Sequence, residues 1–420
     1  MRFLYNLLIY LALPFILLRL LWRSRNLPDY RKNISERFGF CPHKLKNCIW
    51  VHSVSVGESI AAIPLIKLIQ KNYPNIPIVV TNMTPTGRAR IKAAFNETVL
   101  QTYIPYDFPD AVHRFLNRIN PKIAIILETE LWPNLFAKIK EKNIPLIVTN
   151  ARLSEKSFLG YQRIASVTKD MLTAVTKLAA QGKADLERFI SLGLSQEKGV
   201  FTGNLKFDLE ITSDLFAKGE ALRKKLGEDR PVWIAASTHE GEEEIILAAH
   251  KLILEKDPNA LLVLVPRHPN RFDQVAELVT KNGFSMVRRS QNGECSSDTK
   301  VYLGDTMGEM MLLFASIDVA FVAGSFAEVG GHNVLEPAAL SKPVLSGPIL
   351  FNFTEISQKL MDAKGLLIVK NAEELAQTVN KLFGDKNYCK EIGENAKRVV
   401  DENRGALLKQ FHLIEGLLAG

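Results

Sequence analysis

The chain has 420 residues, of which 47% are hydrophobic, 23% charged and 8% aromatic. This length exceeds what one compact core usually holds and suits two domains, so a small binding module is excluded. The apolar content is typical of a folded globular protein and argues against wholesale disorder. Four cysteines occur, and they form neither a CxxC pair nor a secreted disulfide framework: Cys41, Cys48, Cys295 and Cys389. The folded part is therefore expected in a reducing compartment.

The formal net charge of +8 is concentrated at one end of the chain. Residues 1–48 hold nine basic and two acidic residues, a net charge of +7, whereas the rest of the chain holds 44 basic and 43 acidic ones. A nearly neutral body with one basic end beside an apolar segment favours an anionic membrane surface as partner and gives no indication of nucleic-acid binding.

The first element in chain order is an apolar segment at residues 3–22. It has about the 20 residues that a spanning helix needs, although Arg19 must snorkel and Pro14 weakens its middle. We expect residues 1–24 to form a membrane anchor helix that either spans the bilayer or lies in its surface. A cleaved signal peptide is the alternative, but no small-residue cleavage site precedes the basic stretch. Because the basic residues follow the segment, the folded body is expected on the cytoplasmic side of the membrane.

Beyond the anchor, short β-branched runs alternate with amphipathic helical stretches, which predicts an α/β fold with parallel sheets covered by helices. Eight strands are expected: Ile49–His52, Ile76–Thr81, Ile123–Leu127, Leu146–Thr149, Val232–Ala236, Leu261–Val265, Val319–Ala323 and Pro343–Leu345. Polar or Gly-rich residues follow each strand, where ligands of such sheets bind. The segment 202–208 precedes a charged helical stretch and is the expected linker between two sheets.

Several common catalytic motifs are absent from the sequence. It contains no GxxxxGK[ST] loop, no GxSxG elbow and no HExxH helix, which removes support for a P-loop ATPase, a serine hydrolase or a zinc protease. It also lacks the DxD arrangement that holds a metal under a nucleotide diphosphate in many sugar transferases. No metal or other cofactor is expected.

Glu58 is the first candidate for chemistry, in the string VHSVSVGES at residues 51–59, where a buried strand runs into a small-residue turn and a helix. One interpretation is that the carboxylate is simply placed favourably at the positive end of that helix. The other is a general base, because a carboxylate in a strand-end cleft can take the proton from an attacking hydroxyl when burial tunes its pKa.

Glu128 and Glu130 follow the next candidate strand, in the string ILETELWPN at residues 126–134. Glu130 is expected to cap the following helix while Trp132 packs in the core. Glu128 directly follows the apolar run, where an acidic residue is costly unless it is paired or functional, so a catalytic role remains open for it.

The second half carries a further group of polar strings after strands or at helix starts: STHEG at 237–241, PRHP at 266–269, DTMGE at 305–309, GS at 324–325 and GGHNVLEP at 330–337. Each alone is explained by capping or turn chemistry. Their clustering in one half favours a ligand site, in which the Gly330–Gly331 pair before a helix offers free backbone N–H groups to a phosphate and Glu336 accepts hydrogen bonds from ribose.

Together these strings resemble the bacterial 3-deoxy-D-manno-octulosonic acid (Kdo) transferases. The resemblance covers almost the whole chain, anchor included, and rests on the following strings: HSVSVGE at 52–58, TPTG at 84–87, PYD at 105–107, ETELWPN at 128–134, NARLS at 150–154, TGNLKFD at 202–208, STHEGEE at 237–243, VPRHP at 265–269, GDTMGE at 304–309, GGHNVLEP at 330–337 and FNF at 351–353. Val334 stands where some relatives are expected to carry proline, a difference that affects loop stiffness and not the chemistry.

The resemblance implies a GT-B fold, with two Rossmann-like domains facing a cleft, and inverting transfer of Kdo from CMP-Kdo to lipid A precursor. It implies an acceptor-binding domain at 25–205 and a CMP-Kdo-binding domain at 206–420. Glu58 would be the general base, with Glu128 and Lys206 supporting the transition state. The implied donor contacts are Pro266, Arg267, Met307, Gly308, Glu309, Gly330, Gly331, Asn333, Leu335 and Glu336.

Two alternatives remain open: a GT-B transferase with a UDP-sugar donor, and a membrane-tethered scaffold that binds sugars or lipid A without turnover. Fold alone does not decide among them. The sequence does not determine the number of Kdo residues transferred, the acylation of the acceptor or the oligomeric state.

Overall fold

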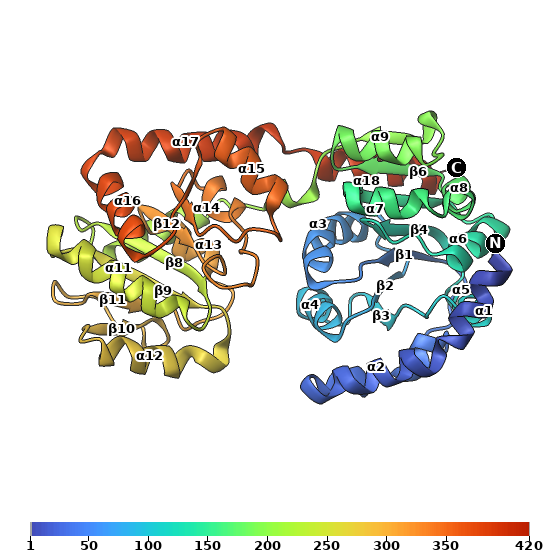
Figure 1. Ribbon diagram of the computed structural model, residues 1–420, viewed down its shortest axis with the longest axis horizontal. Coiled ribbons are helices and arrows are strands. Elements are labelled where there is room, and N and C mark those ends of the chain that lie inside the picture. Colours follow the sequence, from blue (N-terminus) through green and yellow to red (C-terminus); the bar gives the residue numbers. More distant parts are fainter. Residues whose placement is uncertain (1, 420) are drawn as a thin grey trace. The chain divides into compact units, whose positions relative to one another are not determined.

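The computed structural model describes residues 2–419 and divides into two compact units (Figure 1). Unit 1 comprises Met1–Asp208 with Arg404–Gly420, and unit 2 comprises Leu209–Asn403. Each unit contains one seven-stranded sheet in which every strand pair is parallel. Parallel strands joined by helices give the two Rossmann-like domains that are typical of the GT-B fold.

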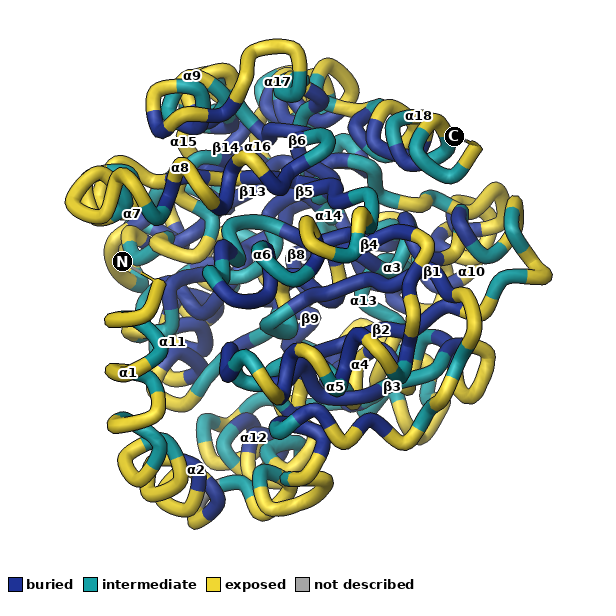
Figure 2. Tube along the Cα trace, turned by 90° about the vertical axis from the view of Figure 1, so that its right-hand side faces the viewer, coloured by how far each residue is buried: buried dark blue, intermediate teal, exposed yellow. Residues whose placement is uncertain are grey.

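The sheet of unit 1 has the strand order β3-β2-β1-β4-β5-β6-β7. Its strands are β1 (Cys48–His52), β2 (Ile78–Asn82), β3 (Leu100–Tyr103), β4 (Pro121–Leu127), β5 (Leu146–Ala151), β6 (Lys177–Ala180) and β7 (Gly199–Phe201). The helices after them are α3 (Val56–Asn72), α4 (Pro85–Phe95), α5 (Pro109–Ile119), α6 (Pro133–Glu141), α7 (Glu155–Gln162), α8 (Ala165–Ala174) and α9 (Lys183–Ser191). The strands β1 and β4 are buried along almost their whole length, because helices cover both faces of the sheet (Figure 2).

Two apolar layers cover this sheet. Helices α5, α6, α8 and α9 pack on one face with residues such as Phe115, Phe136 and Phe189. Helices α3 and α4 pack on the other face, together with α18 (Ala406–Ala419), the last helix of the chain.

Helix α18 belongs to unit 1, whereas the expected domain 206–420 placed it with the second half. Its apolar residues Phe411 and Ile414 pack into the unit 1 core, and Gln410 accepts a hydrogen bond from the Asn150 backbone at 3.1 Å. Asp208 also accepts hydrogen bonds from the N–H groups of Gly405 and Leu407, at 2.7 and 2.8 Å. The contacts therefore divide the chain after Asp208 and again before Arg404.

The sheet of unit 2 has the strand order β10-β11-β9-β8-β12-β13-β14. Its strands are β8 (Val232–Thr238), β9 (Leu261–Pro266), β10 (Met286–Arg288), β11 (Val301–Leu303), β12 (Val319–Val322), β13 (Val344–Ser346) and β14 (Leu366–Ile368). Its helices are α10 (Leu215–Leu226), α11 (Glu242–Lys256), α12 (Phe272–Lys281), α13 (Met310–Ala315), α14 (Leu335–Ala339), α15 (Thr354–Asp362), α16 (Ala372–Gly384) and α17 (Lys386–Glu402).

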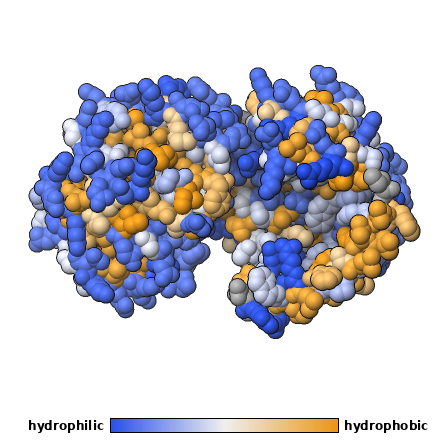
Figure 3. All heavy atoms as spheres, in the orientation of Figure 1, coloured by the Kyte–Doolittle hydropathy of each residue, from blue (hydrophilic) through white to orange (hydrophobic). Residues whose placement is uncertain are grey.

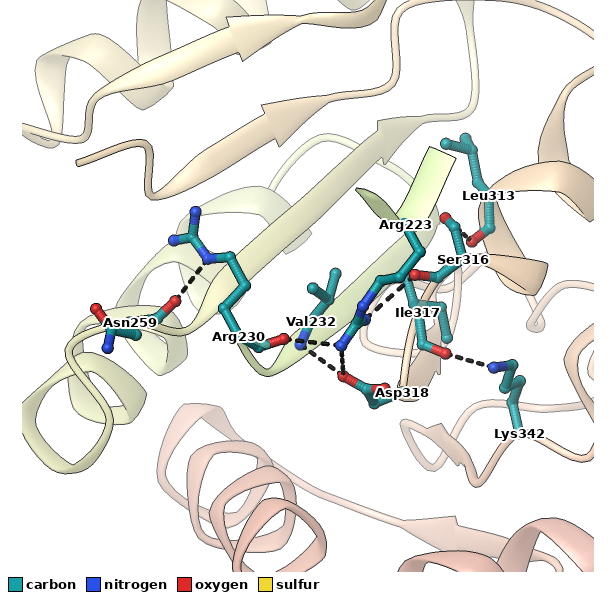
Figure 4. A network of polar contacts seen from close by, with 9 residues as sticks. All are labelled: Arg223, Arg230, Val232, Asn259, Leu313, Ser316, Ile317, Asp318 and Lys342. Carbon is teal, nitrogen blue, oxygen red and sulfur yellow. Dashed lines mark hydrogen bonds and ion pairs between the residues drawn. The ribbon is translucent and has the colours of Figure 1, made fainter. Parts of the chain in front are cut away.

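Polar contacts join the amino ends of the unit 2 strands (Figure 4). Asp318 accepts hydrogen bonds from the Val232 backbone and from Arg223, each at 2.9 Å. Lys342 donates to the Ile317 carbonyl at 2.6 Å, and Arg230 donates to the Asn259 carbonyl at 2.7 Å. This edge is internally satisfied, which leaves the carboxyl edge as the place for ligands.

The apolar N-terminal segment is not one continuous helix. It forms α1 (Arg2–Leu11) and α2 (Leu13–Asn26), with a bend of 49° between the two. Pro14 lies in the first turn of α2, where proline is tolerated but cannot continue the hydrogen bonding of a preceding helix. Within residues 2–419 no single helix is long and apolar enough to cross a membrane, and α1 and α2 pass that test only as a pair.

Candidate active site

Glu58 lies in the first turn of α3, just beyond the carboxyl end of β1. Its side chain is 8% exposed and forms a capping box with Ser55. The Val54 backbone N–H donates to Glu58 Oε2 at 2.7 Å, and the Ser55 hydroxyl donates to Oε1 at 2.9 Å. The carboxylate is thus held in one orientation, which satisfies both the structural and the catalytic interpretation of this position.

Burial raises the pKa of Glu58 to about 7, and the hydrogen bond from Val54 only partly opposes this effect. The negative charges of Glu128 and Glu130 raise the pKa further, so these three carboxylates lie within electrostatic reach of one another. A carboxyl group with a pKa near neutrality is suited to accept a proton at physiological pH.

Glu128 is the first residue after β4 and adopts a left-handed backbone conformation, with φ of 58°. Its N–H donates to the Thr149 carbonyl of β5 at 2.9 Å, which fixes this turn at the edge of the sheet. A non-glycine residue held in this conformation stores strain of about 1 to 2 kcal/mol. Such strain concentrates at functional sites.

Glu130 does not cap α6, contrary to the expectation from the sequence. It accepts a hydrogen bond from the Trp132 indole at 2.8 Å, and the Trp132 ring meets the His52 ring edge to face. The amino end of α6 is instead capped by the buried Asp107, which accepts hydrogen bonds from the Asn134 and Leu135 backbones at 2.9 and 2.8 Å. The ETELWPN loop is therefore braced from β1 and from the PYD string.

Lys206 lies in the short 3-10 helix η4 (Leu205–Phe207), which packs against α3 and α18 within unit 1. The Leu205 N–H donates to the buried Asn150 side chain, and the Lys206 N–H donates to Asn204, each at 2.9 Å. The three residues predicted to be catalytic therefore share unit 1, with Glu58 and Glu128 coupled electrostatically.

All the residues predicted to contact the donor lie in unit 2, at or just beyond the carboxyl ends of β9, β11 and β12, and the last two of them begin α14. Pro266 ends β9, and the Arg267 N–H donates to the Thr238 carbonyl of β8 at 3.0 Å. Within residues 2–419 the half-buried Arg267 guanidinium has no hydrogen-bond or ion-pair partner. An unpaired cation at the edge of a parallel sheet is available to an anionic ligand.

Three histidines surround Arg267, and they were not singled out from the sequence. His239 and His332 approach at 2.8 Å between their Nε2 atoms, and the His239 ring meets the His268 ring edge to face. Burial and the charge of Arg267 lower the pKa of His332 to about 3, so this ring is neutral. In the described part of the chain no such group of side chains is arranged to hold a metal ion.

Glu242 and Glu243 of the STHEGEE string are structural. Buried Glu242 accepts hydrogen bonds from the N–H groups of Gly324 and Ser325 at 2.8 and 3.0 Å, so it fills the loop after β12. Glu243 pairs with Arg271 at 2.6 Å, with both side chains largely removed from solvent. In the sequence, the run of three glutamates at the start of a helix is the feature that indicates a structural role.

The Gly330–Gly331 pair differs from its predicted role. The Gly331 N–H donates to the Gly324 carbonyl at 2.7 Å, so it is not free for a phosphate, and α14 has only five residues. Both glycines have positive φ, and a Cβ at Gly330 would lie 2.4 Å from the Phe351 ring. The pair therefore allows close packing of the FNF loop.

The other predicted donor residues are also partly engaged. Arg289 holds Glu309 in a bidentate ion pair with a shortest distance of 2.8 Å, and this pairing lowers the pKa of Glu309. Met307 is 57% exposed, and the adjacent Gly308 has a φ of 83°. Two further contacts order the GGHNVLEP loop: Asn333 donates to Glu336 at 3.1 Å and accepts from the Leu335 N–H at 3.2 Å.

Comparisons with known proteins agree with this arrangement. A family described as "3-Deoxy-D-manno-octulosonic-acid transferase (kdotransferase)" matches residues 32–209, and "Glycosyl transferases group 1" matches residues 229–399. The chain is 43% identical to the 3-deoxy-D-manno-octulosonic acid transferase of Haemophilus influenzae over 423 residues, covering 99% of each chain. The chain belongs to the Kdo transferase family. It is therefore a glycosyltransferase, and it is also 33% identical to the Kdo transferase of Bordetella pertussis, over 90% of this chain and 89% of that one.

A solved structure supports the fold of this Kdo transferase family member. A glycosyltransferase from Rickettsia africae matches with a TM-score of 0.55 at 16% identity, covering 89% of this chain and 99% of that chain. At this identity the likeness shows the fold alone, which is the two-domain GT-B type.

Proposed function

We propose that this Kdo transferase moves Kdo from CMP-Kdo to lipid A precursor in lipopolysaccharide biosynthesis, with inversion at the anomeric carbon. The identity of the transferred sugar as Kdo is inferred from membership of the family. The observation that carries the mechanism is the buried Glu58 carboxyl, held by a capping box, whose pKa is raised to about 7. In this mechanism Glu58 removes the proton from the acceptor hydroxyl as its oxygen attacks, and CMP leaves from the opposite face.

Glu128 and Lys206 support the acceptor side in this proposal. Glu128 is held in a strained turn at the edge of the same sheet, and its charge contributes to the raised pKa of Glu58. Lys206 supplies a cation from η4, which suits stabilisation of negative charge in the transition state.

The donor side of the proposal uses Arg267 for the phosphate of CMP. Its guanidinium has no protein partner within residues 2–419, and the neutral His332 beside it adds no competing positive charge. The loops at Pro266, at 307–309 and at 330–336 provide the remaining contacts, and Glu336 accepts hydrogen bonds from ribose. Arg267 and backbone N–H groups would neutralise the leaving phosphate without a metal.

The site of action in this proposal is the cytoplasmic face of the inner membrane. Large apolar side chains of α1 and α2 are exposed, among them Phe3 at 83%, Phe15 at 73% and Trp22 at 66%. Figure 3 shows apolar side chains gathered over these two helices. Basic residues at Arg19, Arg23 and Arg25 accompany them, as expected for a contact with anionic lipid.

Incubation of the detergent-purified chain with CMP-Kdo and lipid A precursor, followed by mass spectrometry of the lipid, tests the proposal. The expected result is a product heavier than the acceptor by one or more Kdo residues. Transfer from a UDP-sugar in place of CMP-Kdo would support the other transferase, and binding of both compounds without any product would support a scaffold.

A further inference from the structure

A cavity of about 470 Å³ lies where α1 passes over α6 and α8 in unit 1. Five of its lining side chains are nonpolar and two are charged: Phe3, Pro133, Ala137, Val167 and Met171, with Arg2 and Asp170. Its volume is within the range of cavities that bind small organic ligands. None of the residues proposed for catalysis or for donor binding lines it.

Helix α1 forms one wall of this cavity and is fixed to unit 1 by polar contacts. Tyr5 donates to Asp107 at 3.0 Å, and Tyr10 donates to Asp110 at 2.7 Å. Asn6 accepts a hydrogen bond from Asn134, at the amino end of α6, at 2.7 Å. Helix α1 is therefore held in place on unit 1 by hydrogen bonds, in addition to presenting an apolar surface.

The outward face of α1 is apolar, the reverse of a helix on a soluble domain. Leu4, Leu7, Leu8 and Leu11 are all about half exposed or more, and Phe3 both lines the cavity and is 83% exposed. Phe3 therefore joins the apolar surface of α1 to the cavity, and a hydrocarbon chain can pass from a membrane along α1 into it.

We propose that this cavity binds one acyl chain of the glycolipid acceptor, an inference that rests on the proposed function. Pro133 lines the cavity and is the first residue of α6, directly after the loop that carries Glu128 and Trp132. An acyl chain seated there leaves its sugar headgroup on the side of the acceptor loop. Arg2 at the cavity provides a cation for an acidic group on that headgroup.

Kinetics of the full chain with Val167→Trp test this proposal by filling the cavity from α8. The matched control is Ser166→Trp, because Ser166 is the exposed neighbour on the same helix and does not line the cavity. With acylated lipid A precursor, we expect Val167→Trp to raise the acceptor KM about 10- to 100-fold, the loss for excluding a few methylene groups. The KM for CMP-Kdo and the kcat at saturating acceptor should stay within twofold of wild type, and Ser166→Trp should behave as wild type.

The second arm compares acceptors and uses Ala137→Leu, which fills the cavity mildly from α6. For an acceptor stripped of its acyl chains, the KM of either cavity variant should equal that of the wild type. An equal rise for the acylated and the deacylated acceptor would overturn the proposal, as would an unchanged KM for both in a folded variant. Absence of turnover with any acceptor in the wild type would instead contradict the proposed function.

Photolabelling tests occupancy without turnover. Lipid A precursor with a diazirine at the end of one acyl chain should label peptides that contain Ala137 or Met171, and excess unlabelled precursor should suppress the labelling. A diazirine-labelled phosphatidylethanolamine in vesicles is the comparison probe. If it labels the same peptides and excess precursor does not compete, the cavity is a general lipid site and the proposal is wrong.

Discussion

The carboxyl edges of the two sheets have opposite electrostatics although the two units share one architecture. In unit 1, burial raises the pKa of Glu58 and of Glu130, and the charge of Glu128 raises both further. In unit 2, the ion pair with Arg289 lowers the pKa of Glu309, and hydrogen bonds from Ser290 together with the ion pair with Arg288 lower the pKa of Asp305.

The charge left unpaired is therefore of opposite sign in the two units. Within residues 2–419, neither Glu58 nor Glu130 of unit 1 forms an ion pair with a basic side chain, whereas unit 2 presents the unpaired Arg267 guanidinium. The same sheet architecture can thus accept a proton in one unit and bind an anion in the other. Which of the two it does depends on the charged side chains that the loops leave unpaired.

The largest expected effect is on turnover by Glu58→Gln. Loss of a general base should lower kcat by about 100-fold or more, while the affinity for CMP stays within twofold of wild type. Gln can keep the capping box with Ser55, so the fold should be retained. Glu58→Ala is the comparison variant, because it also removes the hydrogen bonds that Glu58 accepts from Val54 and Ser55 and should cost about 1 to 3 kcal/mol of stability. If Glu58→Gln turns over at close to the wild-type rate, Glu58 is not the general base.

The next effect is on donor binding by Arg267→Gln. We expect CMP to bind about 10- to 100-fold more weakly, as for the loss of a hydrogen-bonded ion pair. Arg398→Gln on the exposed face of α17 is the control and should bind as wild type. Calorimetric titration in EDTA measures both, and the wild-type affinity should not change on chelation. Loss of binding in EDTA would mean that a metal holds the phosphate in place of Arg267.

A smaller effect is expected on the pH profile. Because Glu58 must be deprotonated to act as a base, kcat/KM should rise with pH through about 7, the pKa to which burial raises this group. The charge of Glu130 raises that pKa, so Glu130→Gln should move the inflection to lower pH. Glu141→Gln, an exposed change on α6, is the control. A shift to higher pH in Glu130→Gln would contradict the electrostatic account of unit 1.

The smallest effect concerns backbone strain, which both units share. Glu128 directly follows β4 in unit 1, and Ser237 lies within β8 of unit 2, where the register with β9 shifts. Both have positive φ, at 58° and 62°. Glycine at either position should raise the free energy of unfolding by about 1 kcal/mol. Alanine should give no such gain, since its Cβ meets the same strain. Urea unfolding of the four variants measures their free energies of unfolding. Equal stability of the glycine and alanine variants would show that the backbone at these positions is not strained.

Much of the fold could be predicted from the sequence because apolar runs identify buried strands. All eight expected strands are present, from β1 to β13, with bounds shifted by at most a few residues. The six strands that were missed have three or four residues each and give little periodic signal: β3, β6, β7, β10, β11 and β14. β12 and β13 are equally short, but polar or Gly-rich residues directly after them indicate a strand end. The expected domain 206–420 includes α18, because nothing in the sequence pattern indicates that Phe411 of this helix packs in the core of unit 1.

The site was partly predictable for the same physical reason. Strand ends locate Glu58, Glu128 and Arg267, because parallel strands gather their carboxyl ends at one edge. Hydrogen-bond partners are not encoded in spacing. The donation of the Gly331 N–H to Gly324, and the capping of α6 by Asp107 in place of Glu130, depend on loops that only the tertiary structure brings together.

Titration of the Glu58 carboxyl itself tests the central claim most directly. Isotope-edited infrared spectra of wild type minus Glu58→Gln, recorded from pH 4 to 9, isolate the carboxyl band of this residue. The account predicts that the protonated band disappears with a midpoint at about pH 7, as burial and the neighbouring carboxylates require. A midpoint near the ordinary glutamate value of about 4.3 would contradict it, because Glu58 would then be a fully ionised capping residue and too weak a base for the proposed reaction.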